Sequence, residues 1–137
     1  MGPVYAELLL TNAGDIGLHR SGYIKDSQVR KITISSRVDP DVYLMVIPEH
    51  VKLQLGLEQT EQRKIELENG QTVLCGVAEP IEIRFENRRA VANAFVLGDE
   101  VLLGAILIGE LDVVVNEREQ RLTVNPENPT IPRMRMK

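Results

Sequence analysis

The sequence is poor in the residues that mark disulfide-bonded, metal-binding and aromatic-rich proteins. Cys75 is its only cysteine, it has no tryptophan, and only 4% of its residues are aromatic. A lone cysteine excludes an internal disulfide, which is typical of reducing compartments, so we expect an intracellular, cytoplasmic chain. Its two histidines and one cysteine lie far apart in sequence, so we expect no metal site and no cofactor.

Long apolar runs and an excess of positive charge are also missing. No segment is long enough to span a bilayer, and the Leu8–Leu10 run is too short for the core of a signal peptide. The formal net charge is −4, and the one notable basic cluster is the tail, residues 133–137. Because nucleic acids and anionic membranes attract positively charged proteins, we expect neither as a partner.

What the chain does have is an aliphatic composition that favours strands. Hydrophobic residues make up 43% of its 137 residues, which is enough for one domain with its own core. Because aromatics are scarce, that core must consist of Val, Ile and Leu, and Val and Ile favour strands. Many short apolar runs broken by turn signals are typical of a small barrel or sandwich. We therefore predict a single all-β domain over residues 1–137.

The predicted strands are short and joined mainly by hairpins, and they cover residues 4–10, 32–38, 42–47, 63–67, 71–77, 81–85, 90–97, 101–103, 111–115 and 120–124. Asn69-Gly70 is the strongest turn signal, because Asn-Gly favours a type I′ turn with positive φ at both residues. Residues 86–89 are expected to form the turn of the next hairpin.

Between the strands, the sequence predicts little helix. Pro48 opens a short amphipathic helix that ends at Gly56, and residues 105–110 can form a helical turn. Residues 12–26 are expected to form a turn and an irregular surface excursion, because they contain several turn residues. Residues 125–132 are rich in proline and are expected to form an extended tail.

The most informative stretch is the acidic turn Asp39-Pro40-Asp41. Val38 ends the apolar run before it, and the nearly unbroken apolar run Val42–Ile47 follows. A carboxylate in a tight turn between two buried strands is costly to desolvate, so it is either solvated or retained for a function. Asp-Pro-Asp is also a good surface turn by itself, because Asx side chains bond nearby backbone and Pro fixes φ.

The layout resembles that of the retropepsin-like aspartic proteases, in particular their small bacterial homodimeric members. Val38-Asp39 and Val42 match the family's catalytic turn, which reads apolar-Asp-Thr/Ser-Gly followed by a small apolar residue. Pro40 and Asp41 stand where the family has the hydroxyl residue and the glycine. Val101-Leu102-Leu103-Gly104-Ala105 resembles the apolar-Gly segment that packs behind that turn. The resemblance implies a closed acid-protease-like barrel with one or two short helices.

The same resemblance implies a function. In the family, two subunits each contribute one catalytic Asp, and the two carboxylates share a proton to act as base and acid. For this chain it implies an aspartic endopeptidase, a homodimer acting on a peptide or protein substrate. Asp39 would be catalytic, with the turn completed by Pro40, Asp41 and Val42. A flap that closes over the substrate would have at its tip Glu68, Asn69 and Gly70.

The altered turn leaves an alternative open. Pro40 has neither a hydroxyl nor an N–H group, and Asp41 adds bulk and a second charge. A dimer would bring four carboxylates near one axis, where their repulsion opposes catalysis or pushes the turns apart. The alternative is therefore a non-catalytic binding or assembly module that keeps the fold. The run Val42–Ile47 and the chain ends are the candidate dimer surfaces.

Overall fold

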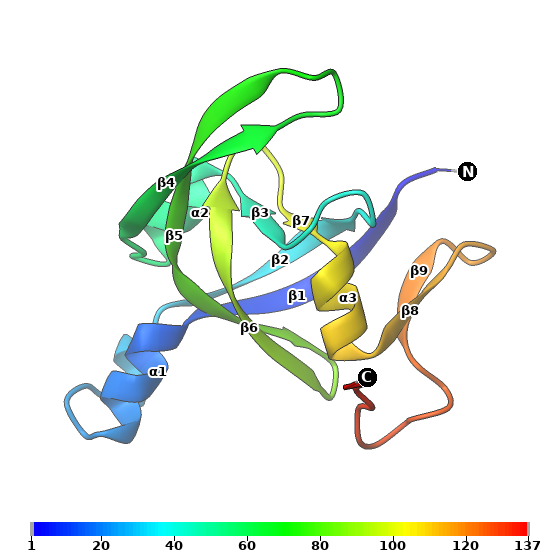
Figure 1. Cartoon of the computed structure of the whole chain (residues 1–137). Helices are drawn as coiled ribbons and strands as arrows, with labels where there is room; N and C mark the ends of the chain where they lie inside the picture. The colour runs from blue at the N-terminus through cyan, green and yellow to red at the C-terminus, as the bar shows by residue number, and fades with distance from the viewer. Residues whose placement is uncertain (1, 137) are drawn as a thin grey trace.

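Strands dominate the computed structural model, which describes residues 2–136. Over these residues, nine strands are joined by three α-helices and one 3₁₀ helix (Figure 1). The strands are β1 (Val4–Asn12), β2 (Lys31–Val38), β3 (Met45–Ile47), β4 (Gln59–Glu66), β5 (Thr72–Phe85), β6 (Arg88–Val96), β7 (Leu102–Leu103), β8 (Val113–Asn116) and β9 (Arg121–Val124). The helices are α1 (Ala13–Arg20), α2 (Glu49–Gln54), α3 (Ala105–Leu111) and the 3₁₀ helix Asp26–Gln28. No helix in this part of the chain is long and apolar enough to cross a membrane.

Seven of these strands form one sheet in the order β1-β2-β7-β3-β6-β5-β4, and β1 also pairs with β5. The pairings therefore lead from β1 through β2, β7, β3, β6 and β5 back to β1, with β4 outside this path. The ladders of β7 are short, with two residue pairs to β2 and two to β3. The predicted mostly-strand architecture is confirmed, whereas a closed barrel stays a prediction.

The core is aliphatic, as the composition predicts. In β1, the side chains of Val4, Ala6, Leu8 and Leu10 alternate inward and are buried, while Glu7 lies on the exposed face. This alternation is the two-residue period of a strand with one wet face. Burying each large aliphatic side chain stabilises the fold by about 1.5–3 kcal/mol, so such strands are held by the core they face.

The prediction for residues 12–26 is wrong, because much of this segment is helical. Asn12 caps α1: its Oδ1 accepts a 3.0 Å hydrogen bond from Asp15 N, and its Nδ2 donates to Leu55 O at 2.8 Å. The Asn and Asp that signal a turn are equally the residues that start a helix. With α1 and α3 both formed, residues 2–136 contain three α-helices rather than one or two.

Several further boundaries differ from the predictions. The apolar run Val42–Ile47 is a strand only at Met45–Ile47, because the backbone of residues 42–44 bonds to α3 instead. The turn predicted at 86–89 shrinks to Glu86-Asn87, since Phe85 pairs directly with Arg88. The tail is bent rather than extended, because its polar groups bond back to the body. The helix predicted from Pro48 is confirmed as α2, and Gly56 follows its end with φ at 63°.

The long strand β5 joins β4, at the end of the sheet order, to the rest of the seven-stranded sheet. Its first part pairs with β4, and its later part pairs with β1. Cys75 lies in the part that pairs with β4 and is only 2% exposed. Its Sγ lies 3.3 Å from Val96 O, and burial raises the pKa of the thiol. Cys75 is therefore a buried, free thiol.

Two buried carboxylates are held by arginines. Glu82 is 6% exposed, and its two oxygens accept 2.7 Å hydrogen bonds from Nε of Arg84 and Nε of Arg89. Burial acts to raise the pKa of Glu82, but the hydrogen bonds from Arg89 and Arg84 outweigh it and lower the pKa. The side-chain hydrogen bonds of Arg30 likewise lower the pKa of Asp15.

We expect the free energy of unfolding to fall as the pH drops below 4.5, the ordinary pKa of a Glu side chain. A carboxyl group whose pKa is lowered by folding stabilises the fold fully above its unfolded pKa. That contribution is lost as the pH falls through the folded pKa. Urea unfolding at a series of pH values measures the effect. Glu82→Gln should flatten the pH dependence, and an unchanged profile in that variant would contradict the assignment.

Candidate functional site

The Asp39 turn follows β2 and is closed by its own backbone. Val42 N donates to Asp39 O at 3.1 Å, which closes a four-residue turn, and Asp39 N donates to Leu103 O at 2.9 Å. Asp41 N donates to Asp39 Oδ1 at 3.0 Å. The side chain of Asp39 therefore has a fixed orientation, as expected of an Asx turn. Asp39 is half-buried, while Pro40 and Asp41 are exposed.

The start of α3 holds the rest of the turn through three backbone hydrogen bonds. Gly104 N donates to Leu44 O at 2.7 Å, Ala105 N donates to Val42 O at 2.7 Å, and Ile106 N donates to Tyr43 O at 3.0 Å. These carbonyls satisfy N–H groups that have no partner inside a helix at its first turn. The loop and the helix start therefore form one hydrogen-bonded unit.

Gly104 is required by the close approach of the two segments. A Cβ at this position would lie 2.4 Å from Leu44 O and 2.5 Å from Val42 O, closer than Cβ atoms approach a backbone oxygen. The φ of Gly104 is −94°, so the restriction is spatial rather than conformational. The apolar-Gly segment thus packs directly behind the acidic turn.

Asp39 and its turn line a hollow of about 280 Å³. The walls come from the start of β1, the end of β2, the turn itself and the end of β8, and their residues are Gly2, Pro3, Val4, Arg37, Val38, Asp39, Pro40, Asp41, Val115 and Glu117. The hollow thus combines three carboxylates with one guanidinium. Over residues 2–136, no group of three or more His, Cys, Asp or Glu side chains is placed to hold a metal ion.

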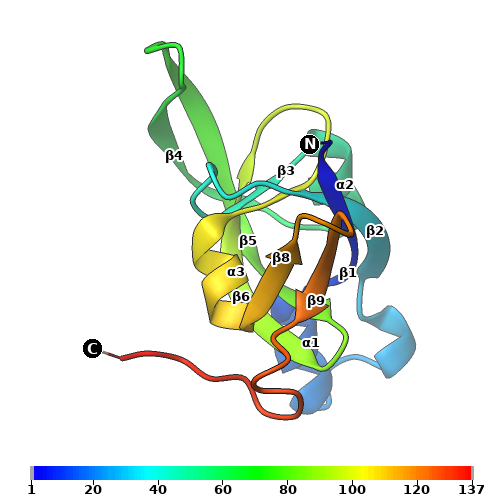
Figure 2. The ribbon, with the colours of Figure 1, turned by 90° about the vertical axis from the view of Figure 1, so that its right-hand side faces the viewer.

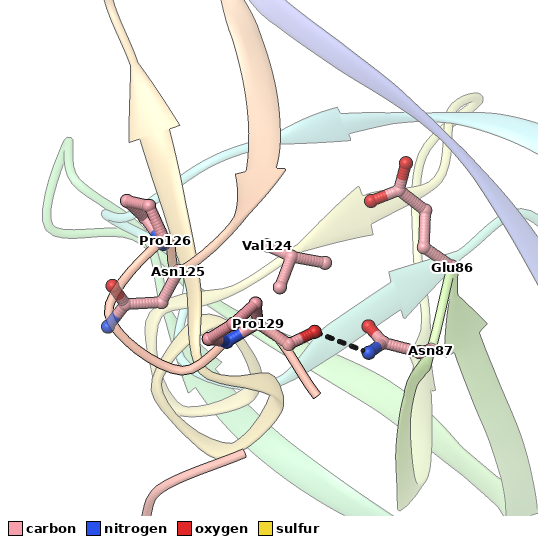
Figure 3. A pocket seen from close by; sticks show the side chains of 6 residues that line it. All are labelled: Glu86, Asn87, Val124, Asn125, Pro126 and Pro129. Carbon is pink, nitrogen blue, oxygen red and sulfur yellow. Dashed lines mark hydrogen bonds between the residues drawn. The ribbon is translucent and has the colours of Figure 1, made fainter. Parts of the chain in front are cut away.

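A second hollow of about 380 Å³ lies away from this turn, between the β5–β6 turn and the segment after β9 (Figure 3). Asn87 Nδ2 donates to Pro129 O across it at 2.8 Å. Its lining contains one ionisable side chain, and the residues are Glu86, Asn87, Val124, Asn125, Pro126 and Pro129. This hollow offers no pair of acid and base, so the Asp39 turn remains the candidate site.

Glu68, Asn69 and Gly70 lie at the tip of the β4–β5 hairpin, where the sequence predicts a turn. In both views the hairpin projects from the sheet on the side of the loop that follows β2 (Figures 1 and 2). The predicted type I′ turn is wrong, because positive φ occurs only at Gly70. Gly70 N donates to Leu67 O at 2.9 Å and Leu67 N donates to Gln71 O at 2.8 Å, which makes a longer loop.

The structure exposes two apolar side chains that sequence reasoning missed. Tyr43 is 76% exposed and Ile106 is 48% exposed, and the backbone bond between them places both beside the turn. Each lies in an apolar run, which suggests burial. Only the departure of residues 42–44 from the strand turns the side chain of Tyr43 outward.

The fold, rather than the sequence, relates this chain to known proteins. Its sequence matches no known family and no curated protein. Among solved structures, it is similar to the retroviral protease-like domain of Ddi1 from Leishmania major, with a TM-score of 0.56 and 7% sequence identity. The match covers 92% of this chain and 90% of that domain. At this identity the likeness shows the fold alone, which is retropepsin-like.

Proposed function

We propose that this chain is an aspartic endopeptidase that acts as a homodimer, with Asp39 as the one catalytic carboxylate of each subunit. The observation that carries the proposal is the fixed carboxylate: Asp39 Oδ1 is held 3.0 Å from Asp41 N, in a turn fastened to α3. The fold likeness to a retroviral protease-like domain supports the same reaction class.

The chemistry requires a second copy of the turn. At a two-fold axis, two Asp39 carboxylates would share one proton, because two like charges at short range are unfavourable. The ionised carboxylate removes a proton from water, which attacks the peptide carbonyl, while the protonated one donates to the carbonyl oxygen. Proton transfer to the leaving nitrogen then accompanies cleavage of the C–N bond. The backbone bonds of the turn would orient both carboxylates before substrate arrives.

The proposed dimer surface lies beside the turn. Tyr43 and Ile106 are exposed apolar side chains at its edge, and a two-fold axis near Asp39 would bring them against their copies. The strand Met45–Ile47 cannot serve, because its three residues are buried in the core. The β4–β5 hairpin, with Glu68, Asn69 and Gly70 at its tip, is proposed as the flap that closes over a peptide or protein substrate.

The proposal is tested by measuring both peptide cleavage and the oligomeric state of the chain. The chain is incubated with an unstructured protein substrate from acid to neutral pH, and its solution mass is measured by sedimentation. Cleavage by the dimeric species supports the proposal. A folded, dimeric sample that cleaves nothing at any pH would favour the non-catalytic module.

That second candidate function has its own support in the turn. Pro40 has no N–H to donate, and exposed Asp41 adds a charge to a hollow that already contains Asp39 and Glu117. In a dimer these carboxylates would repel one another, which opposes close approach of two turns. A binding or assembly module would tolerate this repulsion better than an enzyme.

Restoring the turn separates the two candidates. For an endopeptidase, Pro40→Thr with Asp41→Gly should raise the cleavage rate about tenfold or more, because it removes two charges per dimer and restores a hydroxyl and an N–H. The rate is measured on the same substrate as the parent chain. If the double variant folds and dimerises but gains no cleavage, the module is the better assignment.

A further inference from the structure

The C-terminal end of α3 carries an unusual residue. Asp112 follows the helix with φ at 52° and ψ at 57°, in the left-handed region that residues other than glycine seldom adopt. A carboxylate at this end of a helix also faces the negative end of the helix dipole. Both features are unfavourable, so other contacts must hold Asp112 in place.

Those contacts come from the C-terminal segment. Asp112 Oδ1 accepts from Asn125 Nδ2 at 2.9 Å, and Oδ2 accepts from Asn128 Nδ2 and from Arg133 N, both at 2.9 Å. The hydrogen bond from Arg133 N, with that from Asn125, holds the pKa of Asp112 below its ordinary value. Asn125 N also donates to Asp112 O at 3.1 Å. One residue at the end of α3 therefore anchors the segment after β9.

Arg88 completes this arrangement from β6. Its side chain is fully buried, and its Nη2 lies 3.6 Å from Asp112 Oδ2. Its Nε and Nη2 donate to Asp112 O at 3.3 Å, and Nη2 also donates to Asn128 O. We call Arg88, Asp112 and residues 125–133 the C-terminal clamp. Figure 2 shows the segment after β9 passing below β8 and α3.

The two ends of α3 thus contact different segments. Its first residues hold the Asp39 turn through the bonds of Gly104, Ala105 and Ile106, and its last turn ends in the clamp. The helix has only seven residues, which is too few to be stable by itself. Its position therefore depends on the burial of Leu107 and Leu111 in the core and on the contacts that hold each end.

We propose that the C-terminal clamp is a positioning element for the Asp39 turn, acting through α3. This inference rests on the proposed function for its catalytic consequence, but its structural part stands without it. Loosening the clamp should let the last turn of α3 fray. Because the helix has only seven residues, fraying at its end should also weaken the hydrogen bonds at its start. The clamp residues do not touch the substrate; they act through the helix.

The test is hydrogen exchange in Asp112→Asn. This change keeps the size of the side chain and its tolerance of the left-handed region, but it replaces one acceptor oxygen with a donor. Amides of Gly104, Ala105 and Ile106 should exchange about tenfold faster than in the parent chain, beyond any global loss of stability. The milder Asn128→Ala, which removes one bond to Asp112, should give a smaller change in the same amides.

The matched control is Asp15→Asn. The Asp15 carboxylate is likewise held by hydrogen bonds, from the backbone N–H and the side chain of Arg30, but it lies in α1, at the other end of the molecule from the β4–β5 hairpin (Figure 1). It should lower global stability without selective exchange at residues 104–106. Two results would overturn the proposal. One is equal exchange rates at residues 104–106 in the two variants, and the other is faster exchange in Asp112→Asn that is confined to residues 125–133. Absence of cleavage in the parent chain would overturn only the peptidase assignment, because exchange needs no activity.

Discussion

Asp39→Asn should abolish peptide cleavage, with a loss of at least about 1,000-fold. The amide is nearly the same size as the carboxyl group and can still accept the hydrogen bond from Asp41 N, so the fold should be unaffected. It can neither take a proton from water nor donate one to the substrate at useful pH. The rate of fragment formation from an unstructured substrate measures the loss.

The matched control lies two residues away. Asp41→Asn removes the same charge from the same turn, but this side chain is exposed and has no place in the proposed proton transfer. It should retain or increase the rate, because repulsion at the axis falls. Mixing and refolding parent chains with Asp39→Asn should also lower activity more than dilution does, because hybrid dimers lack one carboxylate. Equal rates for Asp39→Asn and the parent chain would exclude Asp39 as the catalytic group.

Gly104→Ala should destabilise the protein by about 3 kcal/mol or more. The added methyl group would meet two backbone oxygens, those of Leu44 and Val42, which cannot move aside as a flexible side chain can. Overpacking costs about 1–3 kcal/mol, and separating the loop from α3 also weakens hydrogen bonds worth about 1 kcal/mol each. Urea unfolding gives the free energy directly.

Gly109→Ala is the matched control for this change. It makes the same substitution within α3, the helix that Gly104 precedes, but a Cβ at residue 109 meets nothing within 4 Å. Because alanine is the better helix former, this variant should be more stable by about 0.5–1 kcal/mol. A loss of stability in Gly104→Ala with a gain in Gly109→Ala would show that residue 104 must be glycine because of close packing behind the turn. A loss of similar size at both positions would contradict it.

The parts of the fold that sequence predicts well are those set by local pattern. The alternation of Val4 to Leu10 and the hairpin around Asn69-Gly70 are local signals, and the structure contains both elements. The helix α1 was not predictable in the same way, because Asn12 and Asp15 are favoured in turns and at helix starts alike. The choice is made by distant groups, since Asn12 also bonds Leu55 O and Asp15 bonds Arg30.

The residues of the candidate site and of the clamp also differ in how far the sequence predicts them. The acidic turn and Gly104 could be predicted together because both resemble segments of the retropepsin-like family, although they are far apart in the chain. Nothing local marks Arg88 or Asp112. Arg88 follows Glu86-Asn87 and precedes another arginine, a string typical of an exposed turn, yet its side chain is fully buried. Its side chain bonds both the end of α3 and the returning segment 125–133, and these are contacts between distant parts of the chain.

The buried thiol of Cys75 has a practical consequence. It is the only cysteine in the chain, and it lies in the part of β5 that pairs with β4. Because this sulfur is buried, we expect a thiol reagent to modify it when the strands around it open, and slow modification then follows the population of the open state. Since Cys75 is the only cysteine in the sequence, its modification rate reports that opening without an engineered label, in the parent chain and in each variant discussed above.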